Sequence, residues 1–239
     1  ICAAMGNDGD QFLHAAHIFK NNQETANLYI TSEQGESGRF NYGILYSNAA
    51  DGKSHLTIKP VYYAKSKNYG AKLEKFNFSA EMLADGWLDV SQGIDDSNKK
   101  QYYEFFVNMD AMRKSVETNN FFPLDYANAE FGLEITNDVA NQSFHLWMRE
   151  GYGNLNAPTA STNLTFIKGD SDYNVGEGAA TAKHAFAIGA YVGHTTWKAL
   201  NGNSYEFRGN NIKGNIAPFS SHGPYLGSEQ KPTIAAPGH

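Results

Sequence analysis

The sequence predicts a mixed fold, in which a partial α/β core with a parallel sheet is interrupted by an inserted antiparallel β-sandwich. Two observations predict it. The continuous apolar run Ala185–Tyr191 is typical of a strand that is covered on both faces, as in a parallel sheet between helices. The residues from about 13 to 170 instead form short segments of alternating apolar and polar residues, separated by polar turns that contain glycine. Such segments are typical of antiparallel strands with one solvated face.

These two patterns of apolar and polar residues divide the chain into three predicted parts. Residues 1–12 form one core strand, Ile1–Met5, which ends in the turn-forming residues Asn7, Asp8 and Gly9. Residues 13–175 form the sandwich insertion, and residues 176–239 return to the core. The chain starts and stops within apolar segments, so we expect it to be part of a longer protein.

The sandwich is predicted from the number and the alternation of its short strands. In one of them Phe131, Leu133 and Ile135 share a face, while the residues between them point to the other. Short strands without a long helical period indicate a jelly-roll-like sandwich. One short helix is expected over residues 110–117, where apolar residues recur at helical spacing. The predicted strands are Ala26–Thr31, Phe40–Tyr46, His55–Tyr63, Lys72–Phe78, Tyr102–Met109, Phe131–Thr136, Ser143–Arg149 and Asn163–Ile167.

Composition excludes several classes of partner. The net charge is −6 and no basic block occurs, so nucleic acid is not expected as a ligand. No apolar run approaches the roughly 20 residues that a membrane-spanning helix needs. The single cysteine, Cys2, excludes an internal disulfide and a cysteine-rich metal site.

Four segments resemble subtilisin-like serine proteases, the subtilases. Phe219–Pro224 reads FSSHGP and Lys231–Gly238 reads KPTIAAPG, which together resemble the paired F-S-S-x-G-P and K-P-x-[IV]-x-A-P-G motifs of that family. Ala3–Gly9 resembles the family's A-A-x-G-N-x-G segment, and Ala182–Tyr191 resembles the strand that follows it. The four segments occur in the family's order and cover roughly 40 residues. Some subtilases, such as the clostridial germination proteases, carry a jelly-roll domain at a similar point.

The resemblance implies a Rossmann-like core and peptide-bond hydrolysis through an acyl-enzyme. In that family the asparagine at the position of Asn7 donates its amide to the oxyanion, so Asn7 is the predicted oxyanion-hole residue. Ala4, Met5 and Gly6 would form a wall of the substrate-binding pocket. Met5 is bulkier than the small residue that is common there. Taken alone, however, Asn7-Asp8-Gly9 is also an ordinary turn sequence.

The family's catalytic Asp, His and Ser have no counterpart in these 239 residues. Neither D-[ST]-G, nor H-G-T-H-x-A, nor G-T-S occurs. The chain by itself is therefore expected to be inactive toward peptides, since the triad needs all three groups in mutual hydrogen-bond reach. The resemblance also implies a bacterial protein that is secreted or lies in the cell envelope. The incomplete core is expected to expose strand edges that favour self-association.

No cofactor is required by this chemistry. His14 and His17 lie three residues apart but lack a third ligand, so a solvated or capping role is the favoured interpretation. Asp170, Asp172 and Asn174 could supply oxygen ligands to calcium, yet their spacing matches no EF-hand, and a plain solvated turn is the alternative.

Two other functions stay open at this stage. The parent protein could be a non-catalytic, subtilase-derived scaffold that has lost its triad. Alternatively, the sandwich could be a module that binds carbohydrate or protein. The aromatic residues that could form its binding surface, if they are not core residues, are Tyr62, Tyr63, Tyr102, Tyr103, Phe105 and Phe106.

Overall fold

The computed structural model describes residues 2–35, 38–49, 51–68, 70–120, 122–149, 152–174, 180, 182, 184–207, 209, 211–224 and 230–238. The chain divides into two units, which are described one at a time. The first contains Ile1–Gln11 and Asp170–His239, and the second contains Phe12–Gly169. The positions of the two units relative to each other are not determined.

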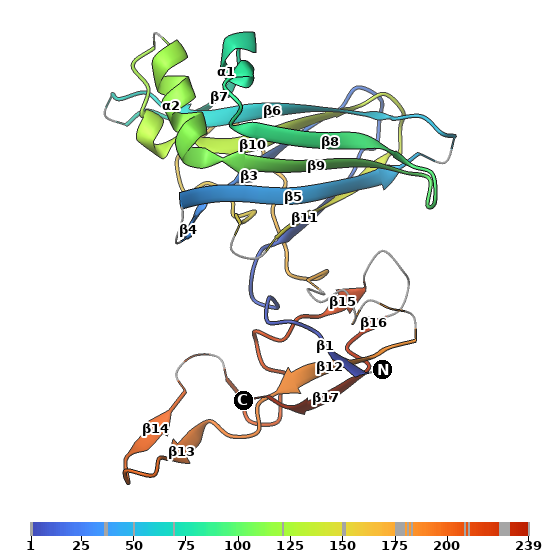
Figure 1. Ribbon diagram of the computed structural model, residues 1–239, viewed down its shortest axis with the longest axis vertical. Helices are drawn as coiled ribbons and strands as arrows, with labels where there is room; N and C mark the ends of the chain where they lie inside the picture. Colours follow the sequence, from blue (N-terminus) through green and yellow to red (C-terminus); the bar gives the residue numbers. More distant parts are fainter. Residues whose placement is uncertain are drawn as a thin grey trace. The chain divides into compact units, whose positions relative to one another are not determined.

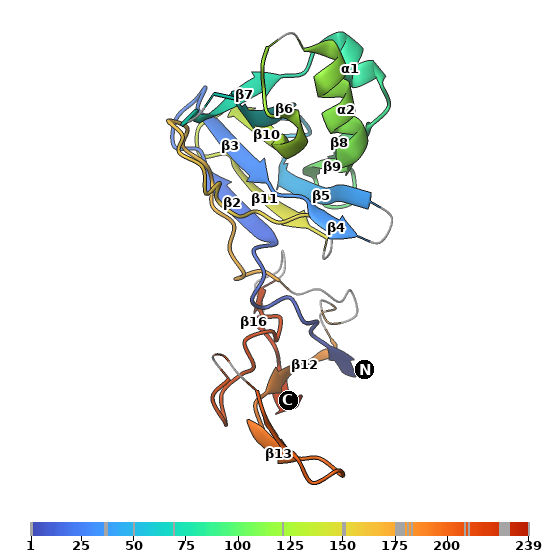
Figure 2. The same cartoon turned by 90° about the vertical axis from the view of Figure 1, so that its left-hand side faces the viewer.

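The second unit is built on two antiparallel sheets, which Figure 2 shows facing each other. The larger sheet has the order β2-β11-β5-β9-β8, with β4 pairing to β5. Its strands are β2 (His14–Ile18), β4 (Glu33–Gly35), β5 (Gly38–Asn48), β8 (Leu88–Asp95), β9 (Lys100–Asn108) and β11 (Ser143–Met148). The smaller sheet has the order β3-β10-β6-β7. Its strands are β3 (Thr25–Ile30), β6 (Leu56–Lys65), β7 (Leu73–Asn77) and β10 (Glu130–Asn137).

Alternation along the strands creates one hydrophobic core between these sheets. In β10 the side chains of Phe131, Leu133 and Ile135 are all buried, as are those of Tyr103 and Phe105 in β9. Because successive side chains of a strand point to opposite faces, each sheet contributes every second residue to this core. The residues between them are mostly half-buried, in agreement with outward-facing positions.

Two helices close one end of the core (Figure 1). α1 (Ala80–Ala84) begins where Ser79 Oγ accepts from the Met82 backbone N–H at 3.3 Å. α2 (Met109–Asn119) begins in the same way, with Asn108 Oδ1 accepting from Ala111 N–H at 3.1 Å. Such caps satisfy donors that have no partner within the helix. The short 3₁₀ helix η1 (Tyr126–Asn128) follows before β10.

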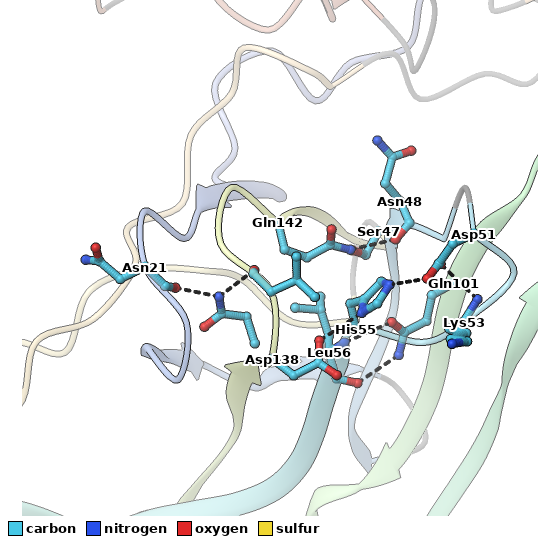
Figure 3. A network of polar contacts seen from close by, with 12 residues as sticks. Asn21, Ser47, Asn48, Asp51, Lys53, His55, Leu56, Gln101, Asp138 and Gln142 are labelled. Atoms are coloured by element: carbon cyan, nitrogen blue, oxygen red, sulfur yellow. Dashed lines mark hydrogen bonds and ion pairs between the residues drawn. The ribbon is translucent and has the colours of Figure 1, made fainter.

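Buried polar groups tie the strands together at another point of the sandwich (Figure 3). The side-chain amide of Gln101, in β9, donates to Leu56 O at 2.9 Å and accepts from Leu56 N–H at 3.2 Å. Since Leu56 begins β6, this amide links the larger sheet to the smaller one. Gln142 Nε2 donates to both Ser47 Oγ and Asn48 O at 2.6 Å. The side-chain amides of Gln101 and Gln142 thus have partners in the interior, where an unpaired amide is costly.

His55 connects two turns in the same network. Its Nδ1 lies 2.8 Å from Asp138 Oδ1, and its Nε2 lies 2.9 Å from Asp51 Oδ2. These two carboxylates raise the pKa of His55 above its ordinary value. The backbone N–H of Lys53, together with His55, lowers the pKa of Asp51.

The first unit contains a parallel sheet with the order β1-β12-β17. Its strands are β1 (Cys2–Ala4), β12 (Phe186–Tyr191) and β17 (Ile234–Pro237). Two antiparallel hairpins accompany it in this unit. One pairs β13 (Thr196–Lys198) with β14 (Ser204–Glu206), and the other pairs β15 (Gly223–Pro224) with β16 (Gln230–Lys231).

The predicted mixed fold class, with a Rossmann-like α/β core, is wrong. Strands make up 46% of the structure and helices only 9%. Both described α-helices belong to the sandwich unit, so no described helix lies in the unit of the parallel sheet. The error came from the apolar run at β12, which was taken as covered on both faces. In the structure Ala187 is fully buried, whereas Phe186 is 54% exposed.

Most of the predicted strands of the middle zone are confirmed, with shifted ends, as are the helix and the strand before Asn7. β2, β4, β8 and α1 were not predicted. The predicted strand Asn163–Ile167 is wrong, because this segment runs over the outer face of the smaller sheet without joining a ladder. There Leu164 and Phe166 pack on Tyr29 and Tyr63.

No helix among the described residues is long and apolar enough to cross a membrane.

The pairing of His55 predicts how stability depends on pH. The pKa of His55 is raised in the folded state, so protonated His55 stabilises the fold. This contribution is fully present below the ordinary imidazole pKa of about 6.5. The stabilisation is lost as the pH rises through the folded-state pKa. Asp51, with its lowered pKa, contributes above the ordinary Asp value of about 3.9 and loses its contribution as the pH falls through the folded-state pKa.

We therefore expect His55→Gln to destabilise the protein most between about pH 4 and 6.5, and progressively less at higher pH. Urea denaturation at a series of pH values measures this difference. The control is His17→Gln, because burial lowers the pKa of His17 and so gives the opposite sign. A destabilisation by His55→Gln that grows toward pH 9 would contradict the assignment.

Candidate functional site

Three strands of the first unit end at the same edge of their sheet. β1 and β17 both run parallel to β12, with Ala4 opposite Ile188 and Ile188 opposite Ile234. Parallel strands point their carboxyl ends the same way, so the residues that follow them gather at one edge. Met5, Gly6 and Asn7 follow β1 at that edge. Ligand sites are typically found at the carboxyl ends of parallel strands.

The loop after β1 is fastened to the segment Phe219–Ser221. Gly9 N–H donates to Phe219 O at 2.9 Å, and Ser221 N–H donates to Gly6 O at 3.1 Å. Asp8 N–H donates to the Ser221 hydroxyl at 2.9 Å, and the Ser221 side chain is fully buried. Two segments more than 200 residues apart in sequence therefore form one hydrogen-bonded loop pair.

Gly9 allows the two segments to approach this closely. A Cβ atom at this position would lie 2.2 Å from Ser220 O and 2.6 Å from Ser220 C. Both distances are shorter than a van der Waals contact, so any other residue would clash with the backbone of Ser220. Gly6 has φ of 99°, a left-handed conformation that glycine adopts at little cost. The glycines on either side of Asn7 thus set the path of the loop.

Asn174 holds the loop from another side. Its Nδ2 donates to Asp8 O at 2.7 Å and to Gln11 O at 2.6 Å, and the residue is only 4% exposed. Ser220 is also buried, and its hydroxyl accepts from Ala190 N–H, in β12, at 3.0 Å. The hydrogen bonds of the two adjacent serines thus hold the loop against β12.

The side chain of Asn7 is exposed, whereas Asp8 and Gly9 are buried. Within the described part of the chain its amide makes no hydrogen bond. The neighbouring backbone groups are bonded to the 219–221 segment and to Asn174, so the amide is presented to solvent from a loop that is held at several points. An amide that is held in this way can donate to a developing negative charge without carrying a titrating charge itself.

The predicted substrate-binding residues occupy three different environments. Met5 is 1% exposed and packs against Ala3, Ala180 and Ala187. Its backbone N–H donates to Ile188 O at 3.1 Å. Ala4 is exposed, and Gly6 is half-buried. The buried methionine thus anchors the start of the loop, whereas Ala4 and Gly6 remain accessible to solvent.

The candidate metal ligands do not form a cluster. No group of three or more His, Cys, Asp or Glu side chains that could hold a metal ion occurs among the described residues. Asp170 Oδ1 accepts from Asp172 N–H at 3.0 Å, a local turn. His14 Nε2 lies 2.9 Å from His145 Nδ1, and His17 packs edge-on against Phe19. The two histidines of the H-x-x-H pattern thus have different partners.

Of the six aromatic residues singled out in the sequence, Tyr62, Tyr63, Tyr103 and Phe105 are buried. Only Tyr102 and Phe106 reach the surface, as half-buried and 37% exposed side chains respectively.

No protein-family model matches the chain, and no curated protein gives a significant match. The subtilase resemblance therefore depends on the four motif segments alone, and the assignment stays a proposal.

The two hydrogen bonds of Asn174 predict its importance for the loop. Asn174→Ala should lower the free energy of unfolding by about 1–3 kcal/mol, because two hydrogen bonds are lost, each contributing roughly 0.5–1.5 kcal/mol. Gln11 O loses its side-chain donor, and Asp8 O keeps only the Gln11 N–H. Urea denaturation, together with amide hydrogen exchange at Gly9, measures the effect. Asn215→Ala is the control, since this exposed amide lies in the same unit, and a change within about 0.5 kcal/mol is expected there. Equal effects of the two variants would show that Asn174 does not hold the loop.

Proposed function

We propose that the first unit supplies the oxyanion-stabilising part of a subtilisin-like serine endopeptidase, with Asn7 as the donor. The observation that carries the proposal is the hydrogen-bonded pairing of the Gly6–Gly9 loop with Phe219–Ser221. These are two of the segments that resemble the family, and they lie far apart in sequence. Their contact supports the interpretation that they serve a common site.

The chemistry follows from the position of the amide. When a nucleophile attacks a peptide carbonyl, its oxygen becomes negative, and a donor at about 3 Å stabilises that charge. Asn7 would donate through Nδ2. The buried partners of Asp8 and Gly9 would keep the loop from moving as the charge develops, so little reorganisation is needed during the reaction. Ala4, Met5 and Gly6 would border the substrate, with Met5 acting through its backbone position.

The nucleophile, its base and the orienting carboxylate must come from polypeptide outside these 239 residues, because no triad motif occurs among them. The substrate class is peptide or protein. The exposed apolar side chains Phe186 and Ile234, on strands of the parallel sheet, support self-association as an additional property of the isolated chain.

The test is Asn7→Ala in the full-length gene product, assayed on a peptide substrate. The expected result is a kcat that falls by about 100- to 1000-fold with little change in KM, a magnitude measured for an oxyanion-hole asparagine of subtilisin itself. Asn7→Asp should be at least as damaging, because the carboxylate accepts rather than donates and repels the oxyanion.

Asp10→Ala is the matched control, since Asp10 is exposed three residues further along the same loop. Its kcat should be unchanged. If Asn7→Ala retains the full kcat, Asn7 has no part in the mechanism. If the full-length protein has no peptidase activity before any substitution, the alternative of a non-catalytic scaffold is favoured instead.

A further inference from the structure

We propose that a cavity beside α2, in the second unit, binds the carboxyl end of short peptides, with Arg113 as the buried donor to the terminal carboxylate. The proposal concerns binding within the second unit, so it does not depend on the peptidase proposed for the first.

The cavity lies between α2, η1 and the turn that follows β6, at the end of the sandwich that α2 closes (Figure 1). Its volume is about 600 Å³, within the range of about 300–1,000 Å³ that is typical of small-ligand sites. The turn is fastened to the segment that leads into η1, because Lys67 N–H donates to Pro123 O and Asp125 N–H donates to Lys65 O, each at 2.8 Å. The charged residues that line the cavity are Lys67, Asp110, Arg113, Lys114, Glu117 and Asp125.

Arg113 is the most deeply buried of these charged residues, with 9% of its side chain exposed. Its Nε donates to Ala129 O at 2.8 Å, and its Nη2 donates to Ser32 Oγ at 3.1 Å and to Glu130 Oε1 at 3.0 Å. These three partners are not among the residues that line the cavity.

The remaining nitrogen of this guanidinium is the one that a ligand can reach. Nη1 lies 4.0 Å from Asp110 Oδ1, beyond hydrogen-bond distance, and it makes no hydrogen bond to any described residue. Arg113 and Asp110 both line the cavity. A buried donor without an acceptor costs free energy, and an acceptor on a ligand would remove that cost.

The charges around the cavity balance. Three cations and three carboxylates line it. Beyond the lining, Glu130 pairs with Arg113, and the backbone N–H of Arg39 donates to Asp110 Oδ2 at 3.3 Å, so these two neighbours add one charge of each sign. In the described part of the chain, the contact between Arg113 and Asp110 is the only ion pair among the lining side chains. The cavity therefore favours a ligand that carries both signs over a net anion or a net cation.

Other classes of ligand fit these groups less well. Phosphate would meet three carboxylates, and no group of three or more His, Cys, Asp or Glu that could bind a metal ion occurs among the described residues. A sugar ring or a quaternary ammonium group needs an open aromatic face. Tyr126 lines the cavity, but Lys67 Nζ already lies over its ring, 5.6 Å from the centroid. The Tyr126 hydroxyl donates to Asn120 O at 3.2 Å and to Phe122 O.

A short peptide with free ends carries the groups that the cavity requires. Its terminal carboxylate can accept from Nη1 of Arg113 in a charge-assisted hydrogen bond. The exposed ammonium groups of Lys67 and Lys114 add positive charge for the same carboxylate. Its α-ammonium group and its backbone N–H groups can donate to the three lining carboxylates. A tripeptide also has the size of the ligands that cavities of this volume hold.

The test measures binding to the whole 239-residue chain. The probes are tripeptides with free ends, screened as a mixture by equilibrium dialysis with mass spectrometry and then titrated singly by calorimetry. We expect at least one tripeptide to be retained. Its C-terminal amide should bind at least about tenfold more weakly, because the charge-assisted hydrogen bond to Arg113 is lost. Added salt should weaken binding too, since Lys67 and Lys114 are exposed.

Substitutions locate the binding in this cavity. Arg113→Lys keeps the charge but lacks Nη1, so the affinity should fall by at least about tenfold. Lys67→Ala and Lys114→Ala should each weaken binding by about two- to fivefold. Lys53→Ala is the matched control, because Lys53 is an exposed cation of the same unit outside the cavity, and it should bind like the wild type.

Thermal unfolding checks that each variant is folded. If Arg113→Lys does not fold, the comparison of acid with amide and the two lysine variants still decide the proposal. The proposal is overturned if no tripeptide is retained, or if the acid and its amide bind equally well. It is also overturned if Lys67→Ala and Lys114→Ala both bind like the wild type. Tighter binding of inorganic phosphate than of any tripeptide would identify a plain anion site instead.

Discussion

The candidate site depends on hydrogen bonds between two loops that are far apart in sequence. Asp8 N–H donates to the Ser221 hydroxyl where both residues are buried, and Gly9 N–H and Ser221 N–H donate to Phe219 O and Gly6 O beside it. Removing one partner of a buried bond costs more than the bond itself contributes, since the remaining group stays desolvated. The path of the loop is therefore fixed on both sides of Asn7. A single exposed amide between fixed neighbours is what distinguishes this loop from an ordinary asparagine-glycine turn.

The sandwich uses polar groups in a related way. The core between its sheets is apolar and would tolerate some sliding, because hydrophobic contact is non-directional. The amide of Gln101 bonds both backbone groups of Leu56, and this arrangement is satisfied at one register only. Arg113, in α2, also makes directional bonds: its guanidinium donates to Ala129 O, Ser32 Oγ and Glu130 Oε1. Burial raises the pKa of Glu130, and the nearby Arg113 guanidinium opposes this shift.

The sequence shows where apolar and polar residues alternate. It does not show which distant segment packs on each face of a strand. β5, β9 and β10 were predictable because every second residue is apolar. β2 was missed because its small and polar residues, such as Ala15 and His14, become buried only through contacts with β11. The run at β12 is apolar on both faces, but sequence cannot state whether both faces are covered. The segment at 163–167 has strand-like residues, yet it covers a sheet instead of extending one.

In the candidate site, too, local features were predictable and distant contacts were not. Asn7 and the FSS segment were found because motifs record local chemistry, whereas the role of Asn174 depends on two carbonyls more than 160 residues away. The adjacent pairs Tyr102-Tyr103 and Phe105-Phe106 contain a further signal about which residues face outward. Neighbouring residues in a strand point to opposite faces, so only one member of each such pair can belong to a surface layer. By this rule Tyr102 and Phe106 lie on the face of β9 opposite to the core residues Tyr103 and Phe105.

The same rule separates the two faces of β9. A strand whose inward residues are Tyr103, Phe105 and Val107 is held by its core, so its outward residues can change without loss of the fold. On such a face, solubility alone would favour charged side chains at every outward position. The chain instead places Tyr102 and Phe106 on either side of one carboxylate. The Tyr42 hydroxyl donates to that carboxylate, so the outward layer of this strand pair satisfies its half-buried acceptor with a group of the same sheet face.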